Sequence, residues 1–285
     1  MTANGTLRSR AQQLKEKWPA YGPLLDFYID VREAQDASRS GFCADCLVPD
    51  GSAREENGEV ASSSLNDDLV LDAQASRRLF SSLCRVGEAA NEYFAGQVQK
   101  INEIMSSGAL DIDSLIASWN KPRKIEQAAA TAGIDARVLS FLVANCARPS
   151  IEAARDLYLA GVELETWKKV YCPACGSLPA LNVLKGEPVQ RCSICTKCGC
   201  EWPGDRLACA ICGDRGKDTR SYFHAEDEEA YRIDVCDNCR NFVKTIDLTK
   251  TDAPDPVLED LATLHLDVIA VKKGYSRAVP NVWCE

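Results

Sequence analysis

Apolar residues recur every three to four positions through most of the first 170 residues, a period that is typical of amphipathic α-helices. The expected helices span residues 7–18, 24–37, 73–105, 113–119, 123–132, 136–146 and 149–159. Residues 50–64 lack a large apolar cluster and are rich in Gly, Ser, Asn and Glu, so we expect a loop there. The first part of the chain is therefore predicted to be a helical domain, and its pattern indicates no active site.

Prolines, glycines and capping residues set the expected ends of these helices. Pro19 should stop the first helix, and Pro122 should stop the short helix that Asp113 caps. If the long segment 73–105 forms two helices rather than one, we expect the break near Val86-Gly87. Pro149 is expected to begin a separate helix, since proline suits the first helical turn.

The pattern changes at Tyr171, where short β-like stretches replace the helical period. Residues 178–184 and 189–191 flank a turn-like Lys-Gly-Glu-Pro sequence and predict a β-hairpin. Residues 220–224 and 230–235 flank an acidic turn, and apolar residues alternate in the second stretch as in a strand with one buried face. After an Asp/Pro-rich link, residues 257–271 predict one amphipathic helix.

The composition is that of an ordinary globular protein, with 46% hydrophobic and 26% charged residues in a chain of 285. No apolar run approaches the roughly 20 residues that a membrane-spanning helix needs, and residues 1–18 have no signal-peptide core. We therefore expect a cytoplasmic protein without membrane insertion. The formal net charge of −9 makes phosphate-driven binding of nucleic acid a poor hypothesis.

Fifteen cysteines are unusual in such a protein. A reducing cytosol disfavours disulfides, and an odd number cannot pair completely within the chain. Eight of the cysteines form four Cys-x-x-Cys pairs, whose tight turns can direct two sulfur atoms at one metal ion. Glycine follows three of these pairs, where it permits the positive φ that the turn requires. The predicted metal ligands are Cys172, Cys175, Cys195, Cys198, Cys209, Cys212, Cys236 and Cys239.

The grouping of the four pairs is left open by spacing alone. Sequential grouping is favoured because each intervening stretch is one of the predicted hairpins, which gives two closed modules of the rubredoxin or zinc-ribbon kind. Cross-braced grouping is the alternative. Cys192, Cys195, Cys198 and Cys200 lie too close together for all four to be ligands of the same site. We choose Cys195 and Cys198, because Gly199 completes the turn after them. Four sulfur ligands suit iron and zinc equally, and a site with no open position is structural by default.

The remaining cysteines and the histidines point to no further site. Cys43 and Cys46 form a lone fifth pair that would need two further ligands. Cys84 and Cys146 lie on apolar helix faces and are expected in the core, and Cys284 is expected to be free. The two histidines, His224 and His265, stand beside no obvious nucleophile, and the chain carries no phosphate loop or dinucleotide fingerprint. We therefore expect no catalytic residues and no enzyme activity.

The ordered cysteine motifs with their flanks resemble the formate dehydrogenase accessory protein (FdhE) family. The resemblance covers about residues 171–281 and is carried by the following segments: Cys-Pro-Ala-Cys-Gly-Ser-Leu-Pro at 172–179, Cys-x-x-Cys at 195–198 with Glu-Trp at 201–202, Arg-Leu-Ala-Cys-x-x-Cys at 206–212, Cys-Asp-Asn-Cys at 236–239 with Phe-Val-Lys at 242–244, Glu-Asp-Leu-Ala-Thr-Leu at 259–264, Gly-Tyr-Ser-Arg at 274–277 and Asn281. Pro-Leu-Leu-x-Phe at 23–27 matches more loosely. Cys192, Cys200 and the Cys43/Cys46 pair fall outside the family pattern.

This resemblance implies a mainly α N-terminal domain followed by two small rubredoxin-like β modules and a C-terminal helix. The implied divisions are a helical domain at 1–170, modules at 171–206 and 207–250, and a C-terminal helix with tail at 251–285. The resemblance also implies an assembly factor that binds the catalytic subunit of a respiratory formate dehydrogenase before export, with iron in the rubredoxin-like sites.

Three functional hypotheses follow from these observations. The first is the maturation factor just described, with two iron or zinc ions per chain. The second is a rubredoxin-like electron carrier or thiol-redox protein. The third, a zinc-ribbon nucleic-acid binder, lacks a basic face, because residues 168–250 hold 13 Lys/Arg against 12 Asp/Glu. If the first is right, the candidate partner-binding residues are Trp202, Arg206, Tyr275 and Arg277.

Overall fold

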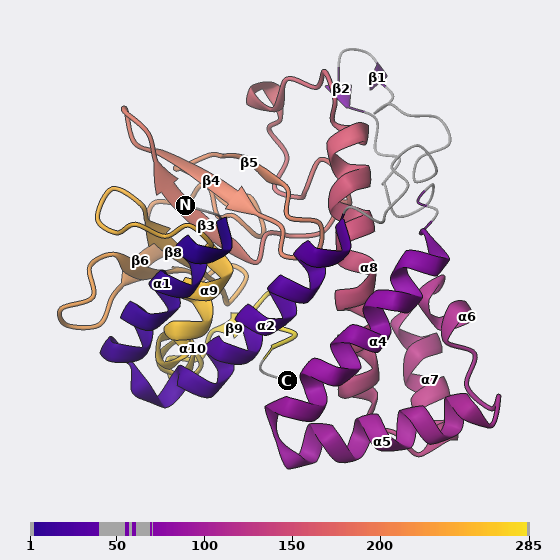
Figure 1. The fold of residues 1–285 in the computed structure, drawn as a ribbon. Coiled ribbons are helices and arrows are strands. Elements are labelled where there is room, and N and C mark those ends of the chain that lie inside the picture. Colours follow the sequence, from indigo (N-terminus) through magenta and orange to yellow (C-terminus); the bar gives the residue numbers. More distant parts are fainter. Residues whose placement is uncertain (1–2, 40–54, 57–58, 61–68, 70, 284–285) are drawn as a thin grey trace. The chain divides into compact units, whose positions relative to one another are not determined.

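The computed structural model describes residues 3–39, 55–56, 59–60, 69 and 71–283 (Figure 1). These residues fall into two compact units. The helical unit contains residues 26–39, 69 and 71–158, and the cysteine-rich unit contains residues 3–25, 55–56, 59–60 and 159–283. The expected helical region, followed by a sheet and C-terminal helices, is confirmed. The four-part division of the sequence remains a prediction.

Five helices and most of a sixth make up the helical unit as described. They are α2 (Gly22–Ser38), whose first turn belongs to the other unit, α4 (Ala73–Ala90), α5 (Glu92–Ser106), α6 (Ile112–Ile116), α7 (Pro122–Ala132) and α8 (Ala136–Tyr158). Helix α4 packs against α5, α6 and α8, and α7 packs against α8. Their apolar faces meet in a core that includes Leu79, Phe80, Leu83, Ile101, Leu139 and Leu142.

The long segment from residue 73 forms two helices, but they divide at Asn91 and not near Val86-Gly87. Asn91 has an extended backbone, and its side chain accepts a hydrogen bond from the backbone N–H of Phe94, which caps α5. Helix α4 continues through Gly87, and a Cβ atom at this position would overlap the ring of Phe94. This glycine therefore serves close packing between two helices and does not end one.

The predicted cap of the short helix was also wrong by two residues. Asp111, and not Asp113, caps α6 by accepting a hydrogen bond from the N–H of Ser114 at 3.0 Å. Asp113 instead pairs with Arg77 of α4 at 2.6 Å. Pro122 ends this stretch as expected and also begins α7.

Pro149 lies inside α8, so the two helices expected at 136–146 and 149–159 are one. Proline has no N–H to donate to the carbonyl four residues earlier, which belongs to Asn145. The fully buried Gln35 of α2 fills this gap, because its side-chain Nε2 donates to the carbonyl oxygen of Asn145 at 2.9 Å. The helix thus remains continuous because a side chain from another helix satisfies the orphaned carbonyl.

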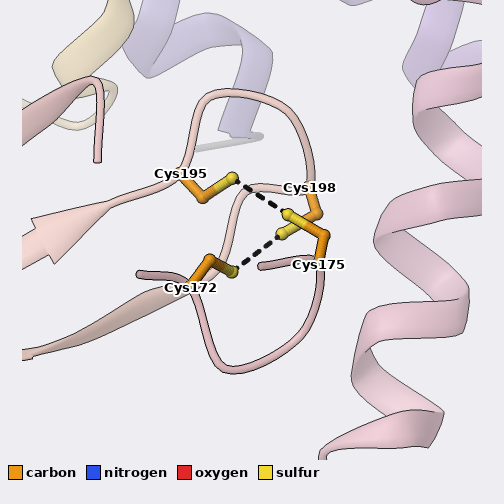
Figure 2. Close-up of side chains that lie close together, drawn as sticks. All are labelled: Cys172, Cys175, Cys195 and Cys198. Carbon is orange, nitrogen blue, oxygen red and sulfur yellow. Dashed lines mark hydrogen bonds between the residues drawn. The ribbon is translucent and has the colours of Figure 1, made fainter. Parts of the chain in front are cut away.

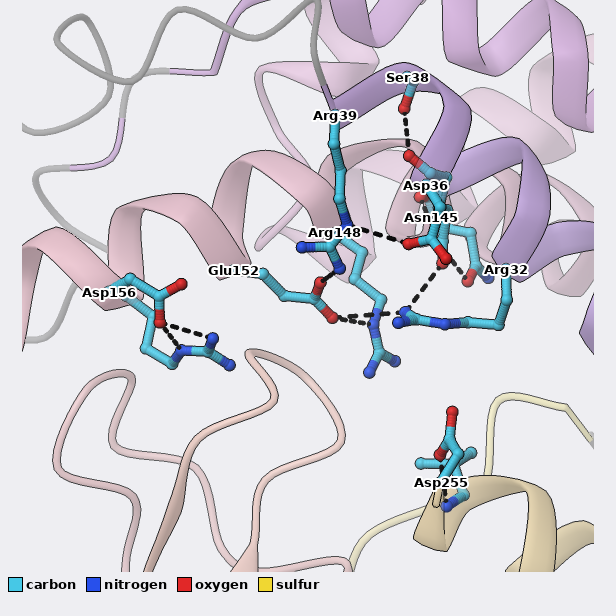
Figure 3. Close-up of polar contacts among 12 residues, drawn as sticks. Arg32, Asp36, Ser38, Arg39, Asn145, Arg148, Glu152, Asp156 and Asp255 are labelled. Atoms are coloured by element: carbon cyan, nitrogen blue, oxygen red, sulfur yellow. Dashed lines mark hydrogen bonds and ion pairs between the residues drawn. The ribbon is translucent and has the colours of Figure 1, made fainter. Parts of the chain in front are cut away.

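Glu152 of α8 forms the main charged cluster between α8 and α2, with Arg148, Arg32 and Arg39 around it (Figure 3). The carboxylate lies 2.7 Å from Nε of Arg148 and 3.5 Å from Nη1 of Arg32. Burial alone would raise the pKa of Glu152, but the neighbouring arginines outweigh it and lower the pKa to about 2. The cluster therefore contributes stability at neutral pH that is lost as the pH falls from about 4.5 towards 2.

A single sheet forms the centre of the cysteine-rich unit. Its strands are β3 (Leu181–Lys185), β4 (Gln190–Ile194), β5 (Glu201–Gly204), β6 (Arg220–Phe223), β7 (Tyr231–Cys236), β8 (Asn241–Asp247) and β9 (Ser276–Arg277). The order is β5-β4-β3-β8-β7-β6, with β9 on β8. Further elements of the unit are α1 (Ala3–Lys17), η1 (Pro19–Tyr21), β1 (Glu55–Glu56), β2 (Glu59–Val60), η4 (Leu164–Thr166), α9 (Pro256–Ala262) and α10 (Leu264–Lys272).

The sheet consists of two copies of the same antiparallel meander. Strands β3, β4 and β5 form the first copy, and strands β6, β7 and β8 form the second in the same order. The two copies join where β3 pairs with β8 in parallel, with Leu181 opposite Lys244. Both predicted hairpins are present, as β3–β4 and β6–β7, and Tyr231, Ile233 and Val235 are buried as their alternation predicts.

The segment expected as one helix at 257–271 is two helices, which divide at Thr263. The reason is Lys244 of β8, whose side chain is fully buried. Its ammonium group donates to the carbonyl oxygens of Asp260 and Thr263, both at 3.0 Å, and so caps the end of α9. It also pairs with the carboxylates of Asp260 at 2.8 Å and Asp267 at 2.6 Å. A buried cation thus fixes both helices to the sheet.

The N-terminal helix α1 packs on the C-terminal helix α9 within this unit (Figure 1). Arg10 donates to the buried carboxylate of Glu259 at 2.6 and 2.9 Å and to the hydroxyl of Tyr231 at 3.1 Å. Bidentate arginine–carboxylate contacts of this kind are geometrically specific. Chain segments that are almost 250 residues apart in sequence are therefore joined directly.

Some expectations cannot be compared with the structure. Of the loop expected at 50–64, the structure describes only residues 55–56 and 59–60, which differ from the expectation because they pair as the short strands β1 and β2. The Cys43/Cys46 pair and Cys284 lie outside the described residues. Among the helices that are described, none is long and apolar enough to cross a membrane.

The contact between Gln35 and the carbonyl of Asn145 predicts an interaction energy with Pro149. Replacing Gln35 with Leu should lower the free energy of unfolding by about 1–3 kcal/mol, because a buried carbonyl loses its donor. In a Pro149→Ala background, the N–H of the new alanine can reach that carbonyl, so the same replacement should cost less. A double-mutant cycle by urea unfolding measures this difference. Equal costs in both backgrounds would contradict the account of α8.

Candidate metal centres

The first four-cysteine group joins the turn before β3 to the turn between β4 and β5. Figure 2 shows the side chains of Cys172, Cys175, Cys195 and Cys198 converging from these two turns. The Sγ atoms of Cys172 and Cys198 are 3.5 Å apart, as are those of Cys175 and Cys195. All four residues are buried.

Both turns of this group have the same backbone geometry. Gly176 has a φ of 69° and donates its N–H to the carbonyl of Cys172 at 3.0 Å. Gly199 also has a φ of 69° and donates to the carbonyl of Cys195 at 2.8 Å. Each glycine lets the chain reverse directly after the second cysteine, because residues with a Cβ atom rarely adopt this conformation. The reversal holds both thiols of a pair on one side of the turn.

The second group joins the turn before β6 to the turn between β7 and β8. Its distances are 3.9 Å between the Sγ atoms of Cys209 and Cys239, and 3.8 Å between those of Cys212 and Cys236. Gly213 reverses the first turn with a φ of 74°. The two groups are those of sequential grouping, so each closes one hairpin of the sheet.

The fourth turn differs, since Arg240 occupies the position that glycine holds in the other three. Its φ is 57°, and its N–H donates to the carbonyl of Cys236 at 2.8 Å. The guanidinium group pairs with Asp237 at 2.7 Å and lies 4.5 Å from the ring centre of Tyr275. Tyr275 also donates to Asp237 at 2.8 Å. These contacts hold a conformation that is unfavourable for arginine. The Cys-x-x-Cys spacing indicated the turn, but no sequence signal indicated the support from Tyr275.

The dimensions of both groups fit a tetrahedral metal ion. A metal–sulfur distance of about 2.3 Å gives sulfur–sulfur edges of about 3.8 Å, which agrees with the observed 3.5–3.9 Å. These separations are far beyond the roughly 2.05 Å of a disulfide bond. All four positions of each tetrahedron are taken by cysteines, so a bound ion would have no open site for a substrate. The geometry does not distinguish iron from zinc, and ligation by the eight cysteines remains a prediction.

The two centres differ in exposure. The first is buried throughout, whereas Cys212 of the second is exposed and Cys239 is half-buried. The second centre has compensating hydrogen bonds, since the N–H of Ile211 points at the Sγ of Cys209 at 3.4 Å and the amide of Asn238 points at the Sγ of Cys212 at 3.7 Å. We therefore expect solvent and reagents to reach the second centre first.

The other described cysteines stand apart from both groups. Cys84 and Cys146 are buried in the helical unit, and burial raises the pKa of Cys84 to about 12 and that of Cys146 further. Burial also raises the pKa of Cys192 to about 11. Thiols with such pKa values stay protonated near neutral pH and are poor nucleophiles. Cys200 is buried beside the first centre and belongs to neither four-cysteine group.

The four candidate partner-binding residues occupy different environments. Trp202 is 1% exposed and packs within β5. Arg277 pairs with Asp260 at 2.7 Å and with Asp267 at 2.6 Å, beside Lys244. Arg206 is exposed, and Tyr275 supports the turn of Arg240 as described above. Contact of these residues with a partner remains a prediction.

The difference in exposure predicts two phases of metal release. With excess chelator, the metal-loaded protein should release one ion quickly from the second centre and one slowly from the first. A Cys209→Ser/Cys212→Ser variant should hold one ion and lack the fast phase, and a Cys172→Ser/Cys175→Ser variant should lack the slow phase. Cys84→Ser is the matched control and should release two ions as the wild type does. A fast phase that persists in the Cys209/Cys212 variant would contradict this assignment.

Comparisons with known proteins connect these centres to one family. The sequence model described as "FdhE, C-terminal domain" matches residues 207–283, which include the second centre and the C-terminal helices. The chain is 26% identical to the FdhE homologue of Aquifex aeolicus, over 96% of this chain and 92% of that protein. It is 31% identical to the homologue of Stutzerimonas stutzeri over 39% of this chain, and 32% identical to protein FdhE of Escherichia coli O1:K1 over 40%. These last two matches span 37% of each relative.

The fold agrees with the same family. The crystal structure of the FdhE protein from Pseudomonas aeruginosa superimposes with a TM-score of 0.57, over 96% of this chain and 93% of that one, at 21% identity. The resemblance inferred from the cysteine motifs is thus confirmed, since the chain is similar to FdhE proteins in sequence and in fold.

Proposed function

We propose that this protein is a cytoplasmic accessory factor for the maturation of formate dehydrogenase, which binds the catalytic subunit of that enzyme before export and catalyses no reaction itself. Two metal ions, iron or zinc, occupy the two four-cysteine centres. The observation that carries this proposal is the pair of closed centres in one sheet, in a chain that aligns with an FdhE homologue over 96% of its length.

The arrangement of the centres supports a role in binding. A four-sulfur site without an open position cannot activate a water molecule or a substrate at the metal. It can rigidify short strands and turns, and the side chains between them then form a fixed surface. A small sheet that carries two such centres is suited to recognising another protein.

The surroundings of the two histidines support the absence of acid–base catalysis. His265 bonds to Glu228 at 2.8 Å and lies 3.5 Å from the hydroxyl of Tyr21. His224 contacts the carbonyl of its neighbour Ala225 at 3.0 Å. Within the described residues, neither histidine forms a hydrogen bond to a serine or cysteine that could act as a nucleophile.

Electron transfer is the second candidate function, and one observation favours it. Cys212 is exposed, so an iron ion in the second centre would have a sulfur ligand at the surface through which an electron could pass. The fully buried first centre lacks such an exit. This candidate predicts a reversible one-electron couple at the second centre and no stable complex with a client enzyme.

An affinity pull-down of the tagged, metal-loaded protein from its own cytoplasm, without oxygen, separates the two candidates. We expect the wild-type protein to recover the catalytic subunit of formate dehydrogenase. Metal analysis of the same sample should give two metal ions per chain of the tagged protein. Cys84→Ser should recover as much, and Cys209→Ser/Cys212→Ser should recover less, because the second centre loses its metal and the turns around it lose their closure. Absence of that subunit, together with a red, reversibly reducible iron centre, would reject the maturation factor in favour of the electron carrier.

A further inference from the structure

A pocket of about 270 Å³ lies beside the second metal centre, within the cysteine-rich unit. One wall is the turn from Cys209 to Ile211, which carries the first candidate ligand of that centre and directly precedes the second, Cys212. The opposite walls are strands β6, β7 and β8 and the segment that follows β5. Because the metal turn forms a wall, the shape of the pocket depends on the closure of the second centre.

The charge of this pocket is opposite to that of the whole chain. Four arginines line it, Arg191, Arg206, Arg220 and Arg232, against one carboxylate, Asp234. The chain as a whole carries a formal net charge of −9. Arginines gathered in one concave site of an acidic protein create a local positive potential, which favours an anionic ligand.

The single carboxylate is already engaged. Asp234 pairs with Nε of Arg232 at 3.0 Å and accepts a hydrogen bond from the hydroxyl of Thr245. Among the described residues, Arg206 and Arg220 form no ion pair. Arg206 donates to the carbonyl of Val189 at 2.8 Å, and Arg220 donates to the carbonyl of Gly216 at 3.0 Å. Two guanidinium charges therefore face the pocket with only neutral oxygen partners.

Arg191 is the most buried of the four, at 7% exposed. Its Nη1 donates to the carbonyl of Ala208 at 3.0 Å, and its Nη2 donates to the carbonyl of Asp205. Its Nε has no hydrogen-bond partner within the described residues. Burial lowers the pKa of Arg191, which means that the charged form is held at a cost that a nearby anion would reduce.

Apolar groups complete the pocket. Leu207 and Tyr222 both line it, and they are 68% and 60% exposed, which is high for large apolar side chains. The guanidinium of Arg232 lies 4.7 Å from the ring centre of Tyr222 and holds that ring in place. A ligand that covers Leu207 and Tyr222 would gain from removing their surface from water.

We propose that this arginine pocket binds a short acidic peptide segment in which carboxylate side chains alternate with apolar ones. The carboxylates pair with Arg206 and Arg220, and an apolar neighbour covers Leu207 and Tyr222. A polynucleotide fits less well, because the rest of an acidic chain repels a long run of phosphates. Assigning this segment to the client enzyme rests on the function proposed above. The binding of an acidic peptide to the pocket is independent of that function.

The test is fluorescence anisotropy with the full-length, metal-loaded protein and a labelled octapeptide of alternating Asp and Leu. We expect saturable binding that weakens as salt is added. Arg206→Ala should weaken it about fivefold, and Arg206→Ala/Arg220→Ala about 25-fold. Lys217→Ala is the matched control, because Lys217 is exposed and lies between Arg206 and Arg220 in the sequence but does not line the pocket. This variant should bind the peptide as the wild type does.

Three results would overturn the proposal. The first is that an octapeptide of alternating Asn and Leu binds as tightly as the acidic one. The second is that the double variant binds the acidic peptide with unchanged affinity. The third is that inorganic phosphate or a single-stranded oligonucleotide displaces the labelled peptide at a lower concentration than unlabelled acidic peptide does. Metal content is measured on each variant. If the Arg220→Ala substitution causes loss of metal, the double variant is replaced in the test by the single variant Arg206→Glu, which alters an exposed residue and should abolish binding. A failed peptide test with a successful client pull-down would reject the pocket and retain the function.

Discussion

Closure of each β-meander by four thiols is the constraint on which the cysteine-rich unit depends. An isolated hairpin of five-residue strands is marginal in water, and here each hairpin ends in two turns whose sulfur atoms lie 3.5–3.9 Å apart. Four thiolates at that separation repel one another unless a cation lies among them. Metal binding in such sites contributes on the order of 10–16 kcal/mol at neutral pH, which exceeds the whole stability of a typical domain.

The remaining elements of this unit follow from that closure. With both meanders fixed, β3 and β8 can pair in parallel, and β8 then lies in the interior of one sheet. Its Lys244 carries a buried charge that ends α9 and holds α10, and Arg277 of β9 shares the same two aspartates. The turn that carries Cys209 also forms one wall of the arginine pocket. If the eight cysteines bind metal as proposed, metal closure, sheet formation and a preformed binding surface follow in succession from their positions.

The sequence predicted the features that repeat over short distances. Helical periodicity located most helices of the first half, and alternation located β7. Cys-x-x-Cys spacing with glycine identified both groups of thiols. Two of the errors arose where a distant residue decides local structure. Pro149 does not divide α8 because Gln35 of another helix satisfies the carbonyl of Asn145, and Thr263 divides the last helix because Lys244 arrives from the sheet. Arg191 likewise gained significance only when the fold placed it beside residues 206–232.

X-ray absorption spectroscopy of the intact protein, at the absorption edge of whichever metal it holds, measures directly whether cysteines alone close each meander. Closure by four thiolates predicts two ions per chain, each surrounded by four sulfur atoms at about 2.3 Å, with no nitrogen or oxygen in the first coordination shell. Fewer than four sulfur atoms per ion, or a light-atom ligand in the first shell, would contradict the closure of both meanders by cysteine alone.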